Sequence, residues 1–352
     1  MSRPHDGQRP FFPFGNPFRL IIRKGSYLSP ELLTLMNSFE ENTAERLMKL
    51  KQNHETYGLS FSWMRLAMES VCETHVDVKT LITDLQFPVS DWDEKWVDMY
   101  LDNSVKLLDI CIAFSSELSR LNQGLLLLQY IAHVLDFSKG FPSAEQLVQA
   151  HSALHDWLHQ ISSRNPKLQN LLNSLRGLSV SHVEDKVKNS PKGKVLVRAL
   201  YGVKIKTLFV CRVFTAAFFG SANNLEDLPM SGKFLWIDPL NELQAYVNEE
   251  IKTLFSSGST TVFKEFVKVQ DHVKHLYSAT AGTIPVEIEV LQKGVSAMAE
   301  SAKALAQGTD TLSELVESFF EIVLTGRDAL LCNLRVSDLL EESNSEEQQV
   351  MT

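Results

Sequence analysis

Three histidines recur four residues apart, and they are the first side chains in the sequence with the spacing for chemistry. His151, His155 and His159 would lie on one face of a helix, where Asp156 and Asp84 could add carboxylate oxygens. Positions i, i+4 and i+8 spread over about 12 Å, too far for three imidazoles to bind one zinc ion. The motif also lacks the glutamate that activates water in H-E-x-x-H sites. We therefore predict a polar helix face here and no metal.

Two shorter spacings also resemble metal-ligand pairs. Cys72 and His75 are three positions apart, but no second pair completes a zinc site around them. His272 and His275 have the same spacing and are interpreted as another polar face. The sequence has neither a glycine-rich phosphate loop nor a G-x-S-x-G nucleophile motif. We predict that the protein is not an enzyme and uses no cofactor.

The segment 186–225 carries eight cations and no acidic residue, in a chain whose net charge is −9. One interpretation is contact with an anionic membrane surface, where each cation contributes about 1 kcal/mol. A second is a membrane span at 203–222, although Arg212 would cost roughly 2.5–3.5 kcal/mol at its centre. A third is a helix in a bundle core whose lysines reach the rim. The residues predicted for surface contact are Lys192, Lys194, Arg198, Lys204, Lys206 and Arg212.

The overall composition is that of an intracellular globular protein. Hydrophobic residues make up 44% and charged residues 22% of the chain, enough for a sizeable core. The negative net charge argues against general nucleic-acid binding, which requires a cationic face. The four cysteines lie far apart and no secretory leader precedes them, so we predict reduced thiols.

An irregular arm is predicted at positions 1–28. The stretch 9–19 holds three prolines, one glycine and four phenylalanines, and prolines at this density block helix and central strand. The arm is either a targeting or membrane-touching segment, or an extended segment whose phenylalanines pack on the body. Ser26 is a candidate phosphorylation site. Positions 1–24 carry one acid, Asp6, against five cations: Arg3, Arg9, Arg19, Arg23 and Lys24.

The rest of the chain has the apolar periodicity of long helices. Ser29 and Pro30 form a helix start, with a capping hydroxyl before a proline in the first turn. No run of alternating β-branched residues indicates a sheet. We predict an all-α, long-helix bundle with coiled-coil-like packing over 29–336, with a linker at 177–192. After the first helix, the others are expected at about 60–84, 90–135, 143–162, 166–176, 193–219, 232–256, 259–278 and 285–335.

The last helix carries a heptad pattern, in which apolar residues alternate steps of four and three from Leu291 to Leu330. A bend near Gly308 is expected. The seam could pack within the bundle or bind a partner helix, and the residues for the partner alternative are Leu312, Val316, Phe319 and Val323. The segment 337–352 holds five acids and no cation, and it is predicted to be a disordered tail.

Long stretches of the sequence resemble the plant BYPASS family, in order and over nearly the whole chain. They are FFPFGNPFR (11–19), SWMRLAMESVCETH (62–75), FPVSDWDEKWVDMYLDNSVKLLDICIAFSSELSRLNQG (87–124), KGKVLVRALYGVK (192–204), VFTAAFFGSANNL (213–225) and FFEIVLTGRDALLCNLR (319–335). The resemblance implies a plant protein with a domain of unknown function and without catalytic residues to transfer.

The resemblance also implies a biological role. Family members are similar to regulators of root and shoot development that restrain a root-derived, mobile, carotenoid-linked signal, which arrests shoot growth. Alternatives are an adaptor in membrane traffic, linked to the exocyst, and an enzyme that modifies the mobile signal. We expect protein partners, peripheral or weakly inserted membrane contact, and no nucleic acid. The expected location is the cytoplasm or a membrane surface, with the plastid as the alternative.

Overall fold

A computed structural model describes the chain over residues 28–86, 94–162, 171, 174–178, 190–221, 225, 228, 230, 232–258, 261–281 and 288–350. These residues form helices and no strand, so the prediction of an all-α bundle is confirmed. The elements are α1 (Pro30–Tyr57), α2 (Phe61–Leu85), α3 (Glu94–Val134), the 3-10 helix η3 (Phe137–Lys139), α4 (Ala144–Ser162), α6 (Pro191–Phe219), α7 (Ile237–Ser256), α8 (Lys264–Thr280) and α9 (Ile288–Val350).

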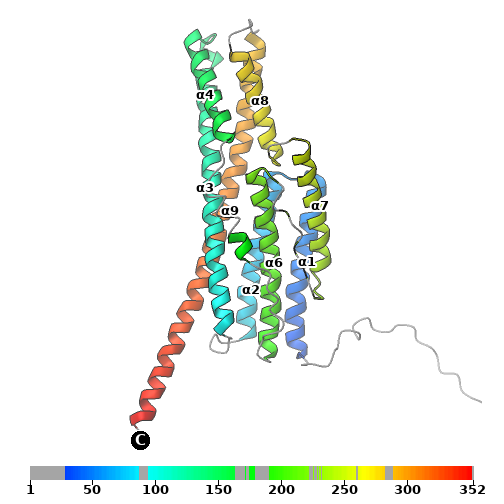
Figure 1. The fold of residues 1–352 in the computed structure, drawn as a ribbon, viewed down its shortest axis with the longest axis vertical. Coiled ribbons are helices and arrows are strands. Elements are labelled where there is room, and N and C mark those ends of the chain that lie inside the picture. The colour runs from blue at the N-terminus through cyan, green and yellow to red at the C-terminus, as the bar shows by residue number, and fades with distance from the viewer. Residues whose placement is uncertain are drawn as a thin grey trace, which may run out of the picture.

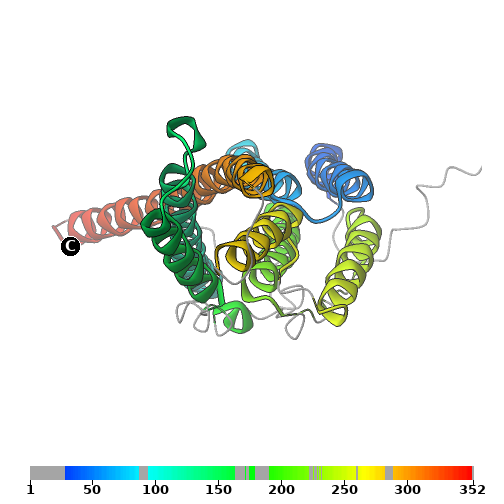
Figure 2. The ribbon, with the colours of Figure 1, turned by 90° about the horizontal axis from the view of Figure 1, so that it is seen from above.

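The helices form an elongated bundle, in which the long helices α3 and α9 run along most of its length (Figure 1). α9 packs on α3, α2 and α8, whereas α4 packs on α3 and α8 at the upper end. α1, α2, α6 and α7 occupy the lower part, and the view from above shows them side by side (Figure 2). The arm up to residue 27, including Ser26, and most of the predicted linker lie outside the described residues.

α1 begins where the sequence indicates a helix start. The Ser29 hydroxyl accepts a hydrogen bond from the Leu32 backbone N–H at 3.3 Å, and Pro30 occupies the first turn, where its missing N–H leaves no helical bond unmade. α6 begins in the same way, with the Ser190 hydroxyl accepting from the Gly193 N–H at 3.3 Å. Gly220 ends α6 in the left-handed conformation that favours glycine.

The basic segment predicted from the sequence is the buried helix α6, which packs against α1, α2 and α7. All residues from Ile205 to Cys211 are buried, including Lys206. A helix that is apolar around its whole circumference belongs in a core or in a membrane, and here the neighbouring helices surround it. No helix in the described part of the chain is long and apolar enough to cross a membrane, so the span considered at 203–222 gains no support.

The heptad of the last helix is a seam inside the bundle. Leu312, Val316 and Phe319 are at most 1% exposed, and Val323 is 4% exposed, because α9 lies against α2 and α3. These residues are therefore covered by the protein's own helices, as in the alternative in which the seam packs within the bundle.

The acidic segment that begins at residue 337 projects past the other helices, as expected for a tail (Figure 1). Its backbone continues α9 and is helical through Val350, in the segment that the sequence predicts as a disordered tail. Glu and Gln have good helix propensity, so the acidic composition does not end a helix that packing has already started.

Gly308 lies within α9, where the sequence suggested a bend, at a close approach to α2. A Cβ at this position would lie 2.9 Å from the Cβ of Phe61, a distance that side-chain atoms rarely reach. We expect Gly308→Ala to destabilise the protein by about 1–3 kcal/mol, because one of the two helices must shift. The urea unfolding midpoint measures this effect. Gln307→Ala, at the neighbouring position, is the control and should change the midpoint little.

Candidate functional site

The six cations predicted to contact an anionic surface do not form one exposed patch. Lys206 is 1% exposed, so that prediction is wrong for this residue. The other five side chains are partly buried around α6. The Lys192 Nζ, for example, donates a hydrogen bond to the Gln86 carbonyl at 3.2 Å. The structure therefore favours the interpretation of this segment as a core helix with polar residues at its rim over that of a basic surface patch.

Lys206 is the centre of a buried polar cluster between α6 and α2. Its Nζ donates to the Ser70 carbonyl at 2.9 Å and to the Thr74 hydroxyl oxygen at 2.7 Å. The next residue on α6, Thr207, places its hydroxyl 3.0 Å from the His75 Nε2. The edge of the His75 ring packs on Phe319 of α9, with ring centroids 5.0 Å apart. The cluster thus joins α2, α6 and α9.

No carboxylate pairs directly with the Lys206 ammonium among the described residues. Burial lowers the pKa of Lys206 from 10.5 to about 7, with repulsion from Arg46 in the same direction. Glu73 and Asp77 oppose this shift, but both form ion pairs with Arg46, the first at 2.8 Å. The site therefore holds a lysine that is only partly charged near neutral pH.

Burial also lowers the pKa of His75, from 6.5 to about 4, and the nearby Lys206 adds to this effect. His75 is thus neutral at physiological pH, and its Nε2 contacts Thr207. Cys72, its partner in the sequence spacing, is buried, and burial raises the pKa of its thiol to about 11. A protonated thiol is a poor nucleophile and a poor metal ligand. We therefore interpret Cys72 and His75 as structural residues and not as a pair of metal ligands.

We expect the neutral state of His75 to make the protein acid-sensitive. Its folded pKa lies below its unfolded value, so stability is present above pH 6.5 and falls as the pH drops toward 4, by at most about 3 kcal/mol. His75→Gln keeps a polar contact for Thr207 and should flatten this dependence. Urea unfolding at pH 6.5 and 4.5 tests the expectation. The control is His155→Gln at an exposed site, which should retain the full dependence.

A second buried charge lies at another α6 contact. Glu40 of α1 has a side chain only 3% exposed and forms an ion pair with Arg198 of α6. The same carboxylate accepts a hydrogen bond from the Leu235 backbone N–H at 2.9 Å. The Arg198 guanidinium also donates to the Lys233 carbonyl and lies 4.2 Å from the centre of the Phe234 ring. Arg198 therefore fastens α6 to α1 and to the segment before α7.

The histidines of α4 lie along one helix face, as their spacing predicts, but they do not converge. His151 stacks on Tyr277 of α8 with ring centroids 4.3 Å apart, and its Nδ1 lies 3.0 Å from the Thr280 hydroxyl. His155 and His159 are exposed further along α4. Asp84 belongs to α2, whereas α4 packs on α3 and α8. No group of three potential metal ligands occurs in the described part of the chain.

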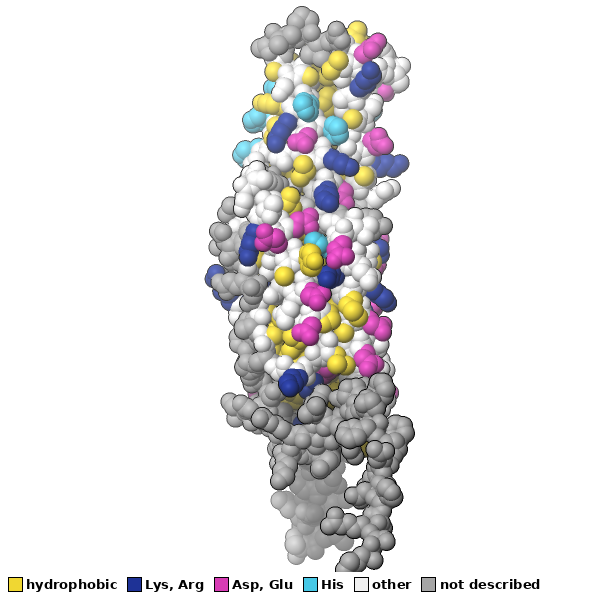
Figure 3. Space-filling model, turned by 90° about the vertical axis from the view of Figure 1, so that its right-hand side faces the viewer, with side chains coloured by type: hydrophobic (Ala, Val, Ile, Leu, Met, Phe, Trp, Pro, Cys, Tyr) yellow, Lys and Arg dark blue, Asp and Glu magenta, His cyan; other side chains and the backbone are white. Residues whose placement is uncertain are grey.

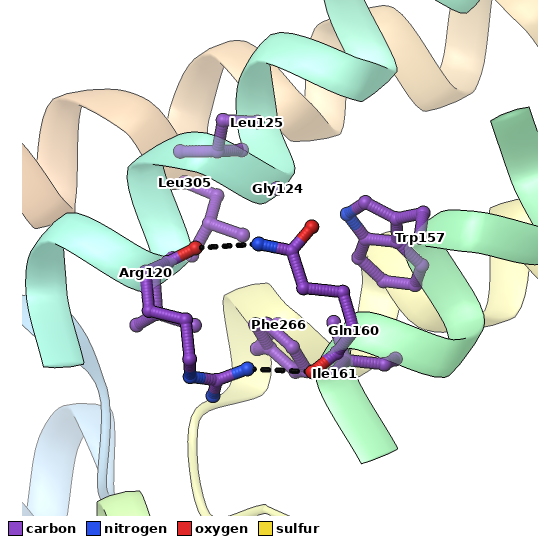
Figure 4. Close-up of a pocket in the computed structure, with 9 residues that line it drawn as sticks. Arg120, Gly124, Leu125, Trp157, Gln160, Ile161, Phe266 and Leu305 are labelled. Carbon is purple, nitrogen blue, oxygen red and sulfur yellow. Dashed lines mark hydrogen bonds between the residues drawn. The ribbon is translucent and has the colours of Figure 1, made fainter. Parts of the chain in front are cut away.

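A small pocket lies where α3, α4, α8 and α9 meet, and Figure 4 shows its lining. The Arg120 guanidinium donates to the Gln160 carbonyl at 2.8 Å, and the Gln160 amide donates to the Arg120 carbonyl at 3.2 Å. Glu117, which is 1% exposed, forms an ion pair with Arg120. These polar groups form hydrogen bonds and an ion pair with one another. We therefore interpret the pocket as part of the contact between α3 and α4, and not as a ligand site. The remaining lining residues are Leu121, Gly124, Leu125, Trp157, Ile161, Phe266 and Leu305.

Sequence reasoning missed the buried ion pairs and the Lys206 cluster. Lys206 lies 132 residues from Thr74, and Arg198 lies 158 residues from Glu40. One signal was available: the neighbours of Lys206 on its own helix face carry no charge and no polar side chain, namely Gly202, Val203, Phe209 and Val210. That pattern predicts a core helix, and a lysine at its centre must then be buried.

These features define the class of the protein as an elongated helical bundle whose unusual polar groups join helices to one another. The chain is 50% identical over 337 residues to "Protein BPS1, chloroplastic" from Arabidopsis thaliana, covering 95% of this chain and 93% of that protein. It is 37% identical over 447 residues to "UPF0496 protein 4" from Oryza sativa subsp. indica, covering 96% of this chain and 98% of that protein. The japonica protein of the same name has the same identity and coverage.

The chain belongs to the BYPASS family, as the resemblance of its sequence stretches indicates. Neither relative carries the name of an enzyme. No protein-family model and no solved structure matches the chain.

Proposed function

We propose that this protein is a non-enzymatic regulator of plant development. It would restrain production of a root-derived, mobile, carotenoid-linked signal that arrests shoot growth, and normal root and shoot development would depend on it. The observation that carries the proposal is the 50% identity to BPS1 across 95% of the chain. Identity at this level over whole chains favours a shared role.

The arrangement of ionisable groups supports a binding role over a catalytic one. The buried Lys206, Glu40 and Glu117 and the half-buried His75 each contact groups on the protein itself. A catalytic acid or base must reach a substrate proton, and these groups lie between packed helices. Action through a protein partner on the outer surface is therefore the proposed mechanism.

Two features suggested an adaptor in membrane traffic, the basic segment and the heptad seam. The heptad residues are buried, and the basic segment is a core helix whose cations other than Lys206 are half-buried at its rim, so these features favour the adaptor less than the regulator. We propose a plastid location, because the relative with 50% identity is named chloroplastic. A fluorescent fusion at the C-terminus tests this, and a cytosolic signal without overlap with chlorophyll would contradict it.

Complementation tests the proposed function. The chain would be expressed in plants that lack their own family member and arrest in shoot growth. Restored shoot growth is the expected result. A protein that accumulates normally but leaves the arrest unchanged would overturn the proposal. In parallel, the purified protein should leave carotenoid-derived substrates unconverted, since turnover would favour the enzyme alternative.

A further inference from the structure

The α1–α7 side of the bundle exposes apolar side chains that no helix in the described part of the chain covers. Met48 of α1 is 45% exposed, and Leu235 and Tyr246, before and within α7, are 51% and 49% exposed. α1 and α7 pack on each other along this side. Figure 3 views the molecule from there and shows apolar side chains interspersed among acidic ones over its lower half, with some lysine or arginine side chains between them.

The acidic side chains follow the same stripes as the apolar ones. Glu41 is seven positions before Met48 on α1, and Glu242, Tyr246 and Glu249 are spaced by four and three on α7, so each set lies on one helix face. These glutamates are exposed. Of the cations on these two helices, Lys51 already pairs with Glu242 at 2.8 Å, whereas Lys49 and Lys252 are exposed. We call this surface the α1–α7 face.

The occupant we infer is a segment of the chain itself. Between positions 1 and 24 the N-terminal arm carries five cations against one acid, with four phenylalanines at positions 11–18. Its composition thus complements the α1–α7 face in both charge and apolar content. The same stretch holds a single serine, so its composition differs from that of the serine-rich transit peptides that are removed on import, and the proposal requires that the protein retains the arm at the proposed plastid location.

The length of the arm, compared with that of α1, favours the same conclusion. The arm leads directly into α1, whose 28 residues extend about 42 Å. The stretch 9–24, if extended, would span up to about 53 Å. The arm could therefore double back along the whole length of α1 and reach every side chain of the α1–α7 face.

We propose that residues 9–24 dock on the α1–α7 face, with phenylalanines against Met48, Leu235 and Tyr246 and cations beside Glu41, Glu242 and Glu249. The docked arm covers the exposed apolar side chains. A partner that binds either the arm or the face would then have to displace the arm.

Photocrosslinking of the full-length protein tests this proposal. Benzoylphenylalanine replaces Phe14, and mass spectrometry locates the crosslinks in an equal mixture of ¹⁵N-labelled and unlabelled protein. We expect most crosslinks within one molecule and in peptides covering residues 31–57 or 233–252. Crosslinks mainly elsewhere on the body, mainly between molecules, or only after addition of anionic lipid vesicles would overturn the proposal.

A matched pair of double variants tests the role of charge. Glu41→Lys with Glu249→Lys reverses two exposed charges of the face, and should reduce the intramolecular crosslink yield at least threefold. Glu317→Lys with Glu321→Lys reverses two exposed charges on α9, and should leave the yield unchanged. Circular dichroism confirms that both variants fold. Equal yields in both folded variants would contradict the proposal.

Discussion

Replacing Lys206 by methionine is expected to make the protein more stable. The ammonium is buried without a direct carboxylate partner among the described residues, and replacing a buried charge by an apolar side chain of similar volume typically stabilises by about 1–4 kcal/mol. The substitution strands no acceptor, because the Thr74 hydroxyl still donates to the Ser70 carbonyl at 2.7 Å. We expect a higher urea midpoint for Lys206→Met at pH 6.

The gain should depend on pH in a direction that follows from the pKa of Lys206. The folded pKa, about 7, lies below the unfolded value of 10.5, so the wild-type protein gains stability as the pH rises between them. The advantage of Lys206→Met is therefore greatest below pH 7 and shrinks toward pH 10. Lys79→Met, at an exposed position of α2, is the control and should change stability little at any pH. A lower midpoint for Lys206→Met at pH 6 would contradict this account of the cluster.

The opposite result is expected for Arg198, on the same helix. Arg198→Met removes the cation that neutralises Glu40 and leaves a buried carboxylate with the Leu235 N–H as its remaining described hydrogen-bond donor. Breaking a buried pair in this way typically costs about 3–5 kcal/mol. The midpoint of urea unfolding and the thermal unfolding temperature should both fall.

A second substitution separates loss of the ion pair from loss of packing. Glu40→Gln in the Arg198→Met background removes the stranded charge while keeping an oxygen that accepts from Leu235. We expect it to restore more than half of the lost stability. If the double variant is no more stable than Arg198→Met, the loss arises instead from the contact of Arg198 with Phe234.

Much of the fold follows from local features of the sequence. Helix starts at Ser29 and Ser190, the heptad from Leu291 to Leu330, and the long helix through Leu118 and Leu128 all depend on residues near one another in the chain. The helical backbone at the end of α9 did not follow, because composition favoured disorder while helix propensity and an established helix favoured continuation.

The candidate sites were harder to predict, because they depend on which helices meet. A lysine in a basic segment is naturally interpreted as a surface residue until α2 is placed against α6. The same is true of Phe319, whose ring lies against His75 and is unavailable to a partner. Sequence periodicity identified the buried faces, but it could not show what each face contacts.

Complementation with the Lys206→Met protein, in plants that lack their own family member, tests most directly whether the Lys206 cluster is structural and the protein acts by binding. If so, Lys206→Met restores shoot growth as fully as the wild-type protein. A variant that is folded, stable and normally accumulated but fails to restore growth would contradict this role, and would place Lys206 among the functional residues.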